Sequence, residues 1–111
     1  MSAGTYDITI DQGSDFALSI TVSDDGVERD LSDWDARAKL KATYASTDAT
    51  TITVNEANAA DGILVMSLSH TQTAALAVGS YVYDLEIYKA DGTKATRLLQ
   101  GRATVRGEVT N

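Results

Sequence analysis

The chain has 111 residues, 43% of them hydrophobic, no cysteine and a formal net charge of −7. This length suits a single domain over residues 1–111, and the lack of cysteine excludes a disulfide framework, a thiolate zinc site and a cysteine nucleophile within it. The acidic balance disfavours nucleic-acid binding, which uses a basic patch, and the absence of a run of about 18 apolar residues or of an N-terminal leader predicts no membrane span and no secretion signal.

Apolar and polar residues alternate along the first part of the chain, which is the period of a half-buried strand. The pattern begins at residues 6–10 and is interrupted around Gly13. It is clearest over residues 16–22, where Phe16, Leu18, Ile20 and Val22 share one face. Asp24-Asp25-Gly26 is a hairpin turn signal, so residues 27–31 are predicted to form a short returning strand.

The middle of the chain is predicted to continue as strands. In residues 36–43, small apolar residues alternate with Arg37, Lys39 and Lys41. Alanine-rich composition leaves a helix open here, but the strict alternation favours a strand with one cationic, solvent-facing side. Residues 52–54 predict a short strand, and residues 63–68, which are apolar on both sides, predict a strand buried on both faces.

The last third combines a helical turn with a hairpin. Ser69 is a plausible N-cap for a turn near residues 70–76, with Gly79 as its terminator. Residues 81–88 and 96–105 predict two strands joined at Asp91-Gly92, and Gly101 indicates a bulge or a close backbone approach. Short strands at this spacing predict an all-β fold, namely an immunoglobulin-like antiparallel β-sandwich of about seven strands. Gly79-Ser80-Tyr81 resembles the tyrosine corner of such sandwiches.

No residue pattern predicts catalysis or metal binding. His70 is the only histidine and stands among serines and threonines without a nucleophile-elbow pattern. The aspartates between residues 24 and 35 lack the spacing of a calcium loop, and Asp84 and Glu86 lack the surrounding aromatics of a glycosidase cleft. We therefore expect a protein that is not an enzyme, with no catalytic residue, no metal and no cofactor.

Interaction residues are expected at the turns and on the outer strand faces. Tyr88 lies on the face opposite the predicted buried Tyr83, and Asp91, Asp24 and Asp25 occupy hairpin turns, so these four are the candidate interface residues. A lone tryptophan, Trp34, is predicted to belong to the core. Residues 1–35 carry nine acids and one base, and residues 36–111 carry seven acids and eight bases, which add up to the 16 acids and 9 bases of the chain. This bias serves solubility or complementary contact between neighbouring subunits.

Four segments form a combined pattern over nearly the whole chain. They are Tyr6-Asp-Ile-Thr-Ile-Asp-Gln-Gly13 with Asp15-Phe16, Asp30-Leu-Ser-Asp-Trp34 leading to Ala36-Arg37, Gly79-Ser-Tyr-Val-Tyr-Asp-Leu-Glu-Ile87 with Asp91-Gly92, and Arg97-Leu-Leu-Gln-Gly101 with Glu108-Val109-Thr110. In order and spacing the pattern resembles small virion proteins of tailed bacteriophages, including the immunoglobulin-like N-terminal domain of baseplate upper proteins.

The resemblance implies a structural subunit without an active site, used in multiple symmetric copies and assembled into the virion in the host cytoplasm. Its partners would be other virion proteins, namely tail, baseplate or fibre subunits, with no nucleic acid and no membrane. In the baseplate relatives this domain anchors a longer fibre-bearing chain, which suggests a tail or baseplate role, including fibre attachment. A capsid decoration protein is the main alternative, and a carbohydrate-binding module is a further one.

Overall fold

The computed structural model describes residues 4–24, 27–28, 30–47, 49–89 and 91–107, and it is almost entirely β-structure with one short helix. The strands are β1 (Gly4–Thr5), β2 (Ile8–Asp11), β3 (Phe16–Thr21), β4 (Ser23–Asp24), β5 (Val27–Glu28), β6 (Asp35–Lys41), β7 (Thr50–Asn55), β8 (Ile63–Leu68), β9 (Gly79–Tyr88) and β10 (Ala95–Arg106). The helix α1 spans His70–Ala74 and a 3-10 turn, η1, spans Ala59–Asp61. More strands are present than the sequence predicts, because β1 and β4 have only 2 residues each and cannot show a period, whereas β5 falls within the short strand predicted over residues 27–31.

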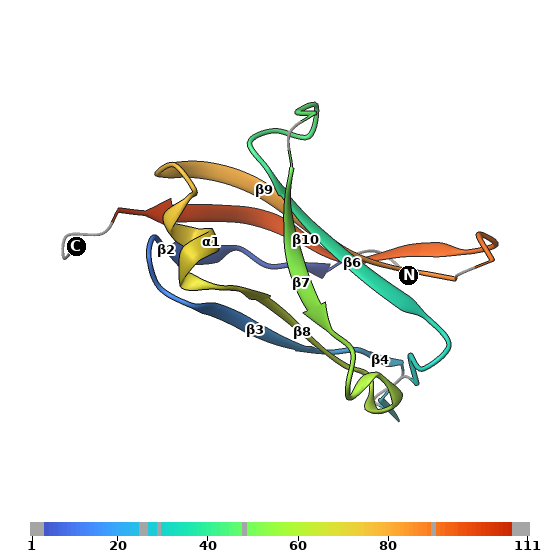
Figure 1. The fold of residues 1–111 in the computed structure, drawn as a ribbon. Helices are drawn as coiled ribbons and strands as arrows, with labels where there is room; N and C mark the ends of the chain where they lie inside the picture. Colours follow the sequence, from blue (N-terminus) through green and yellow to red (C-terminus); the bar gives the residue numbers. More distant parts are fainter. Residues whose placement is uncertain (1–3, 25–26, 29, 48, 90, 108–111) are drawn as a thin grey trace.

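One hydrogen-bonded sheet contains eight of these strands, in the order β1-β10-β9-β6-β7-β8-β3, with β2 also paired to β10 (Figure 1). Its pairs are antiparallel except those of β1 and β2, which run parallel to β10. Strands β4 and β5 form a separate two-stranded ribbon. The sheet is therefore mixed rather than purely antiparallel as predicted.

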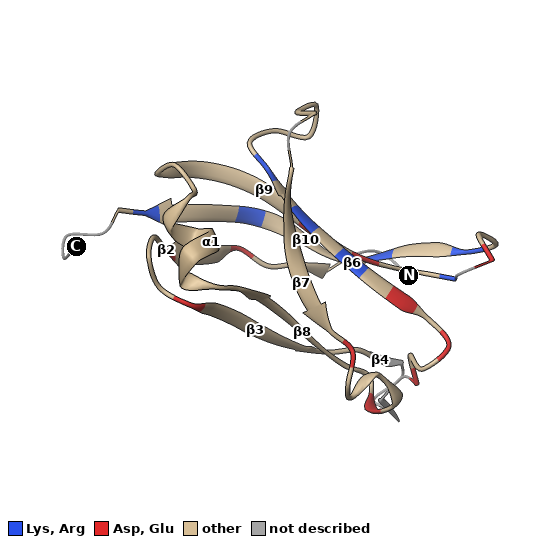
Figure 2. Cartoon of the chain, viewed as in Figure 1, with Lys and Arg blue, Asp and Glu red and all other residues tan. Residues whose placement is uncertain are grey.

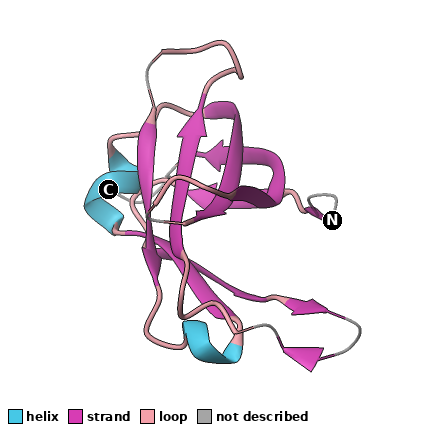
Figure 3. Cartoon of the chain, turned by 90° about the vertical axis from the view of Figure 1, so that its right-hand side faces the viewer, coloured by secondary structure: helices cyan, strands magenta, loops and turns pink. Residues whose placement is uncertain are grey.

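Strand β7 makes the sheet continuous. Its first residues, Thr50 to Ile52, pair with β6, and its last residues, Thr53 to Asn55, pair with β8. The sheet curls through this strand so that β3 and β8 come to face β9 and β10, as a half-barrel (Figure 3). Of the predicted sandwich, the mostly β-structure is therefore confirmed, but the two separate stacked sheets are not. Alternation along a strand reports which side chains point inward, but it does not report which strand is the neighbour.

The inside of the curl is the hydrophobic core. Inward-facing residues of β9 such as Tyr83, Leu85 and Ile87 are at most 2% exposed, and Met66 of β8 is fully buried. Residues 63–68 are not buried on both faces as predicted, because alternate residues of β8 are only half-buried on the outer side of a single-layered sheet. Trp34 packs partly buried against the core.

Local sequence signals predicted the connections well. Ser69 caps α1, since its hydroxyl accepts a hydrogen bond from the Gln72 N–H at 3.2 Å while the Gln72 side chain accepts from the Ser69 N–H at 2.8 Å. The prediction of Gly79 as the helix terminator was wrong, because α1 ends at Ala74 and Gly79 begins β9. The tyrosine-corner hydrogen bond is present: the Tyr81 hydroxyl donates to the Ala77 carbonyl oxygen at 2.7 Å.

Gly101 marks a close backbone approach, as one of its two interpretations predicted. A Cβ at this position would lie 2.2 Å from the Tyr6 carbonyl oxygen, so only glycine admits the segment between β1 and β2. The same oxygen accepts a hydrogen bond from the buried Tyr83 hydroxyl. The strand irregularity in β10 lies elsewhere, between Arg97 and Leu99.

The Tyr83 hydroxyl gives the fold a pH dependence at alkaline pH. Burial, followed by the nearby Asp7 charge, raises the pKa of Tyr83 from 10.0 to about 12. The folded state therefore holds the phenol proton more tightly than the unfolded state does. This preference stabilises the folded state by ~2–3 kcal/mol below about pH 10, and the stabilisation is lost as the pH rises to about 12.

Tyr83→Phe tests this assignment. At neutral pH we expect the substitution to lower the free energy of unfolding by about 1 kcal/mol, because one hydrogen bond is lost. Between about pH 10 and 12 the difference between the two proteins should shrink and then reverse, because the unmodified protein loses ~2–3 kcal/mol there while the variant has no phenol to ionise. Urea unfolding at both ends of this range measures the effect, and a constant difference would contradict it.

Candidate interaction surfaces

The outer face of β6, β9 and β10 carries charged side chains in rows set by strand register. Arg37 stands beside Glu86, and Glu86 beside Arg97. In the next rows, Lys39 pairs in register with Asp84, and Lys41 with Val82, whose other neighbour is Arg102. Cations from two distant segments thus meet across β9, as the basic residues on the strands in Figure 2 show.

On the half of this face nearest the start of β6, the arginines are paired with carboxylates. The Arg37 guanidinium donates to Glu86 with Nε at 2.8 Å, and its carbon lies 4.4 Å from the centroid of the Tyr88 ring. Arg97 Nε lies 3.3 Å from the Asp84 carboxylate. These pairs fix the cations in place and leave little net charge.

The other half carries side-chain cations with no carboxylate within ion-pair distance among the described residues, although the Arg102 N–H donates to the Asp7 carboxylate at 3.0 Å. Lys39 and Arg102 are exposed and Lys41 is half-buried. Lys39, Lys41 and the 65% exposed Tyr44 line a hollow of about 220 Å³ together with Val82, Tyr83, Asp84 and Arg97. We call Lys39, Lys41, Arg102 and Tyr44 the cationic site. Its net positive charge lies on a chain of net charge −7.

Acidic side chains gather at the opposite end of β6, beside η1 and β4 (Figure 2). The described members are Asp30, Asp33, Asp35, Glu56 and Asp61, and we call them the acidic end. Partial burial, and then the Asp35 charge, raise the pKa of Glu56. Hydrogen bonding to the Ser32 side chain, and then to the Ser32 N–H at 2.9 Å, lowers the pKa of Asp30. No group of three metal-ligating side chains with metal-site geometry occurs in the described part of the chain.

The sheet does not close, and an apolar groove of about 400 Å³ lies between its end strands. Leu18 and Ile20 of β3 face the same side as the buried Met66 and Leu64, with which they pair in register. They remain only half-buried because no described strand covers them. The groove is lined by Gly4, Thr5, Tyr6, Leu18, Ser19, Ile20 and Leu99, and we call it the edge groove.

The candidate interface residues that the structure describes lie on different elements. Tyr88 is half-buried beneath Arg37 at the end of β9, rather than freely exposed. Asp91, in the following turn, accepts hydrogen bonds from the Thr93 hydroxyl at 2.6 Å and N–H at 3.0 Å, which, the hydroxyl first, lower its pKa. Asp24 lies in β4 rather than in the turn, and the predicted hairpin is confirmed only as the pairing of β4 with the 2-residue β5, since β3 pairs with β8. Asp25 lies outside the described residues.

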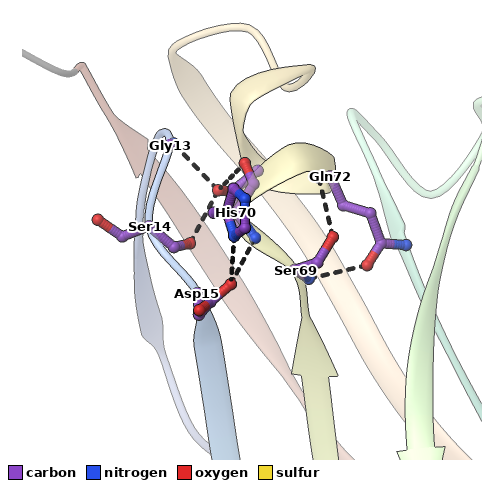
Figure 4. Close-up of polar contacts among 7 residues, drawn as sticks. Gly13, Ser14, Asp15, Ser69, His70 and Gln72 are labelled. Atoms are coloured by element: carbon purple, nitrogen blue, oxygen red, sulfur yellow. Dashed lines mark hydrogen bonds and ion pairs between the residues drawn. The ribbon is translucent and has the colours of Figure 1, made fainter. Parts of the chain in front are cut away.

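His70 belongs to a structural cluster at the start of α1 (Figure 4). Its N–H donates to the Asp15 carboxylate at 2.7 Å, and its ring Nδ1 lies 3.0 Å from the same oxygen. These hydrogen bonds, the backbone one first, lower the pKa of Asp15. Beside them the buried Thr73 hydroxyl accepts from the Gly13 N–H at 3.0 Å and donates to the Ser14 carbonyl at 2.8 Å. The cluster attaches α1 to the turn between β2 and β3.

Sequence reasoning missed the edge groove and the cationic site. Residues 16–21 contain no charged residue and no proline, so they would leave an edge strand unprotected. This composition alone does not place the strand at the edge of the sheet. The alternation of Arg37, Lys39 and Lys41 was recognised as a cationic side. Arg102 joins them only through the pairing of β10 with β9.

Comparison with known proteins identifies a structural likeness only. No family model matches the chain, and no curated protein matches its sequence. Solved structures do match, and among them is the crystal structure of InlP from Listeria monocytogenes, at a TM-score of 0.50 and 15% sequence identity. The alignment covers 94% of this chain and 28% of the InlP chain, so the likeness concerns the fold of one part of a longer protein. Among the described residues, no helix has the length and apolar character needed to cross a membrane.

Proposed function

We propose that this chain is a non-enzymatic structural protein of a tailed bacteriophage particle, in the tail or baseplate, which binds neighbouring virion proteins. The observation that carries the proposal is the edge groove, where the sheet ends at an uncharged strand with half-exposed apolar side chains. Free backbone N–H and C=O groups on an edge strand recognise an extended polypeptide by strand addition. The pockets for alternate side chains then provide specificity.

The groove suits an extended segment of another protein for two reasons. Leu18, Ile20 and Leu99 offer apolar surface whose burial favours association. Both walls are strand edges, because β1 and β3 stand at the two ends of the sheet. A segment lying between them would continue the curl and cover the side chains that the chain itself leaves half-exposed.

We further propose that the fold is a variant of the immunoglobulin-like sandwich. The tyrosine-corner hydrogen bond of Tyr81 supports this relationship. So does the strand order, in which β9 lies between β6 and β10 while β3 pairs with β8. In this interpretation β7 is the strand that crosses from one layer to the other.

The carbohydrate-binding alternative has no support from Tyr88 or Trp34, and its remaining candidates are the exposed Tyr6 and Tyr44. A sugar-binding platform needs an accessible ring face. Arg37 lies over the Tyr88 ring, and the Lys89 ammonium lies 4.6 Å from the centroid of the Trp34 ring. A glycan array that returned a saturable ligand, lost on substitution of Tyr88 without unfolding, would favour this alternative over ours.

Immunogold electron microscopy tests the location. An antibody raised against the purified chain is applied to particles from lysates of the source strain. Label at the tail or baseplate supports the proposal, and label over the capsid supports the decoration alternative. Particles that carry no label while a known virion protein is labelled would refute a virion role.

Ile20→Lys tests the edge groove. An ammonium group placed in the groove should reduce incorporation of the chain into particles by about tenfold or more, since a strand could then pair only by burying a charge. The matched control is Thr21→Lys, because Thr21 is exposed on the other side of β3. Quantitative mass spectrometry of purified particles measures incorporation, and thermal melts confirm that both variants fold. Equal incorporation of the two variants would exclude the groove.

A further inference from the structure

Charge is separated along a single strand. Strand β6 starts at Asp35, within the acidic end, and finishes at Lys41, within the cationic site. Its 7 residues place the two regions about 20 Å apart at roughly 3.3 Å per residue. This separation exceeds the Debye length of about 8 Å at physiological salt, so the two regions do not neutralise each other within one molecule.

Both regions contain charged side chains without an oppositely charged side chain within ion-pair distance among the described residues. The charged side-chain groups of Lys39, Lys41 and Arg102 have no carboxylate within ion-pair distance among the described residues, whereas those of neighbouring Arg37 and Arg97 each have one. At the acidic end, Asp33, Asp35 and Asp61 likewise have no described cation within that distance. The Glu56 carboxyl, whose charge is disfavoured by its surroundings, would be stabilised by an added cation.

We propose that the cationic site binds the acidic end of a second copy of this chain, so that copies associate head to tail. The inference rests on the proposed structural role and names one partner for it. A second copy is favoured by charge complementarity, because the same molecule presents both partners at opposite ends of β6. The hollow beside Tyr44 and Val82 is lined by three cations, Lys39, Lys41 and Arg97, against one carboxylate, Asp84, and Tyr44 offers a hydroxyl donor.

The geometry of such a contact determines the kind of assembly. The two surfaces differ, so the contact is heterologous, and each copy can bind one neighbour at each end. Repetition produces a ring if the rotation closes and a filament if it does not. Because every copy carries net charge −7, association should need enough salt to screen repulsion between whole molecules. It should weaken again near 1 M salt, where the Debye length falls to about 3 Å and the contact itself is screened.

Sedimentation velocity of the purified chain tests the proposal. At about 0.15 M salt we expect concentration-dependent species larger than a dimer. Lys39→Gln combined with Lys41→Gln should weaken association by about tenfold or more, and so should Asp33→Asn combined with Asp35→Asn. The matched control, Lys89→Gln combined with Lys94→Gln, removes the same charge from the β9–β10 hairpin, where Lys89 lies beside Trp34 at the acidic end, and should not weaken association.

Mixing the two neutralised variants gives the sharper result. The first variant keeps an intact acidic end and the second keeps an intact cationic site, so the mixture should stop at one-to-one dimers. An unmodified chain that stays monomeric at every concentration would overturn the inference. So would a monomeric chain whose cationic site binds a poly-glutamate peptide, because the partner would then be another acidic protein.

The outcomes also separate this inference from the proposed function. A monomeric chain that is nevertheless labelled in phage particles would refute self-association and leave the virion role supported. A chain that associates head to tail as described, but is found in no particle, would support self-association and refute the virion role.

Discussion

Gly101→Ala is expected to lower the free energy of unfolding by about 3 kcal/mol, the upper part of the range for steric overpacking. The added Cβ would lie 2.2 Å from the carbonyl oxygen and 2.8 Å from the carbonyl carbon of Tyr6. The obstacle is backbone rather than a flexible side chain, so either the segment between β1 and β2 or strand β10 must move. Urea unfolding followed by circular dichroism measures the change.

Gly4→Ala is the matched control for this prediction. A Cβ at Gly4 would meet its nearest atoms, in Leu99 and Leu98, at 3.6 and 3.7 Å, which are ordinary contact distances. We expect a change within about 0.5 kcal/mol. If the two variants were destabilised equally, glycine flexibility rather than the close approach to Tyr6 would explain the effect.

Thr73→Val is expected to lower the free energy of unfolding by about 2–3 kcal/mol. Valine has nearly the shape of threonine, so packing is preserved while the hydroxyl is removed. The Gly13 N–H and the Ser14 carbonyl would each lose a partner in a partly buried setting, and leaving a buried polar group unpaired costs more than a typical hydrogen bond contributes.

Thr71→Val isolates the hydroxyl effect of Thr73→Val from helix propensity. Thr71 belongs to the same helix but is exposed, and valine and threonine have similar helix propensities. Its substitution should change stability by less than about 0.5 kcal/mol. Hydrogen exchange should show faster opening of the turn after β2 in Thr73→Val only. Protection of that turn at the unmodified level would contradict the role assigned to Thr73.

Features encoded within a few residues could be predicted from the sequence. The alternation over residues 16–22 and 36–43 predicted β3 and β6, because each strand separates inward from outward side chains by itself. The Ser69 cap and the Tyr81 hydrogen bond also connect residues within four positions of each other. In these cases the residues that determine the structure are sequence neighbours.

Features that depend on pairing could not be predicted. The contacts of Thr73 with the turn after β2 join residues about 60 positions apart, and periodicity carries no information about such partners. The cationic site needs Arg102 to face Lys41 across β9, and the edge groove needs β3 to be the last strand of the sheet. Each follows from strand order, which the alternation of residues leaves undetermined.

The parallel pairing of β1 and β2 with β10 constrains the time course of folding. Ile8 lies opposite Ala103, so β2, which is translated early, pairs with β10, which is translated late. During synthesis, the segment that becomes β2 must wait, unpaired, until nearly the whole domain has left the ribosome. Because contacts between such distant residues slow folding, we expect this domain to acquire its native structure only after translation of β10, with the early strands depending on chaperones until then.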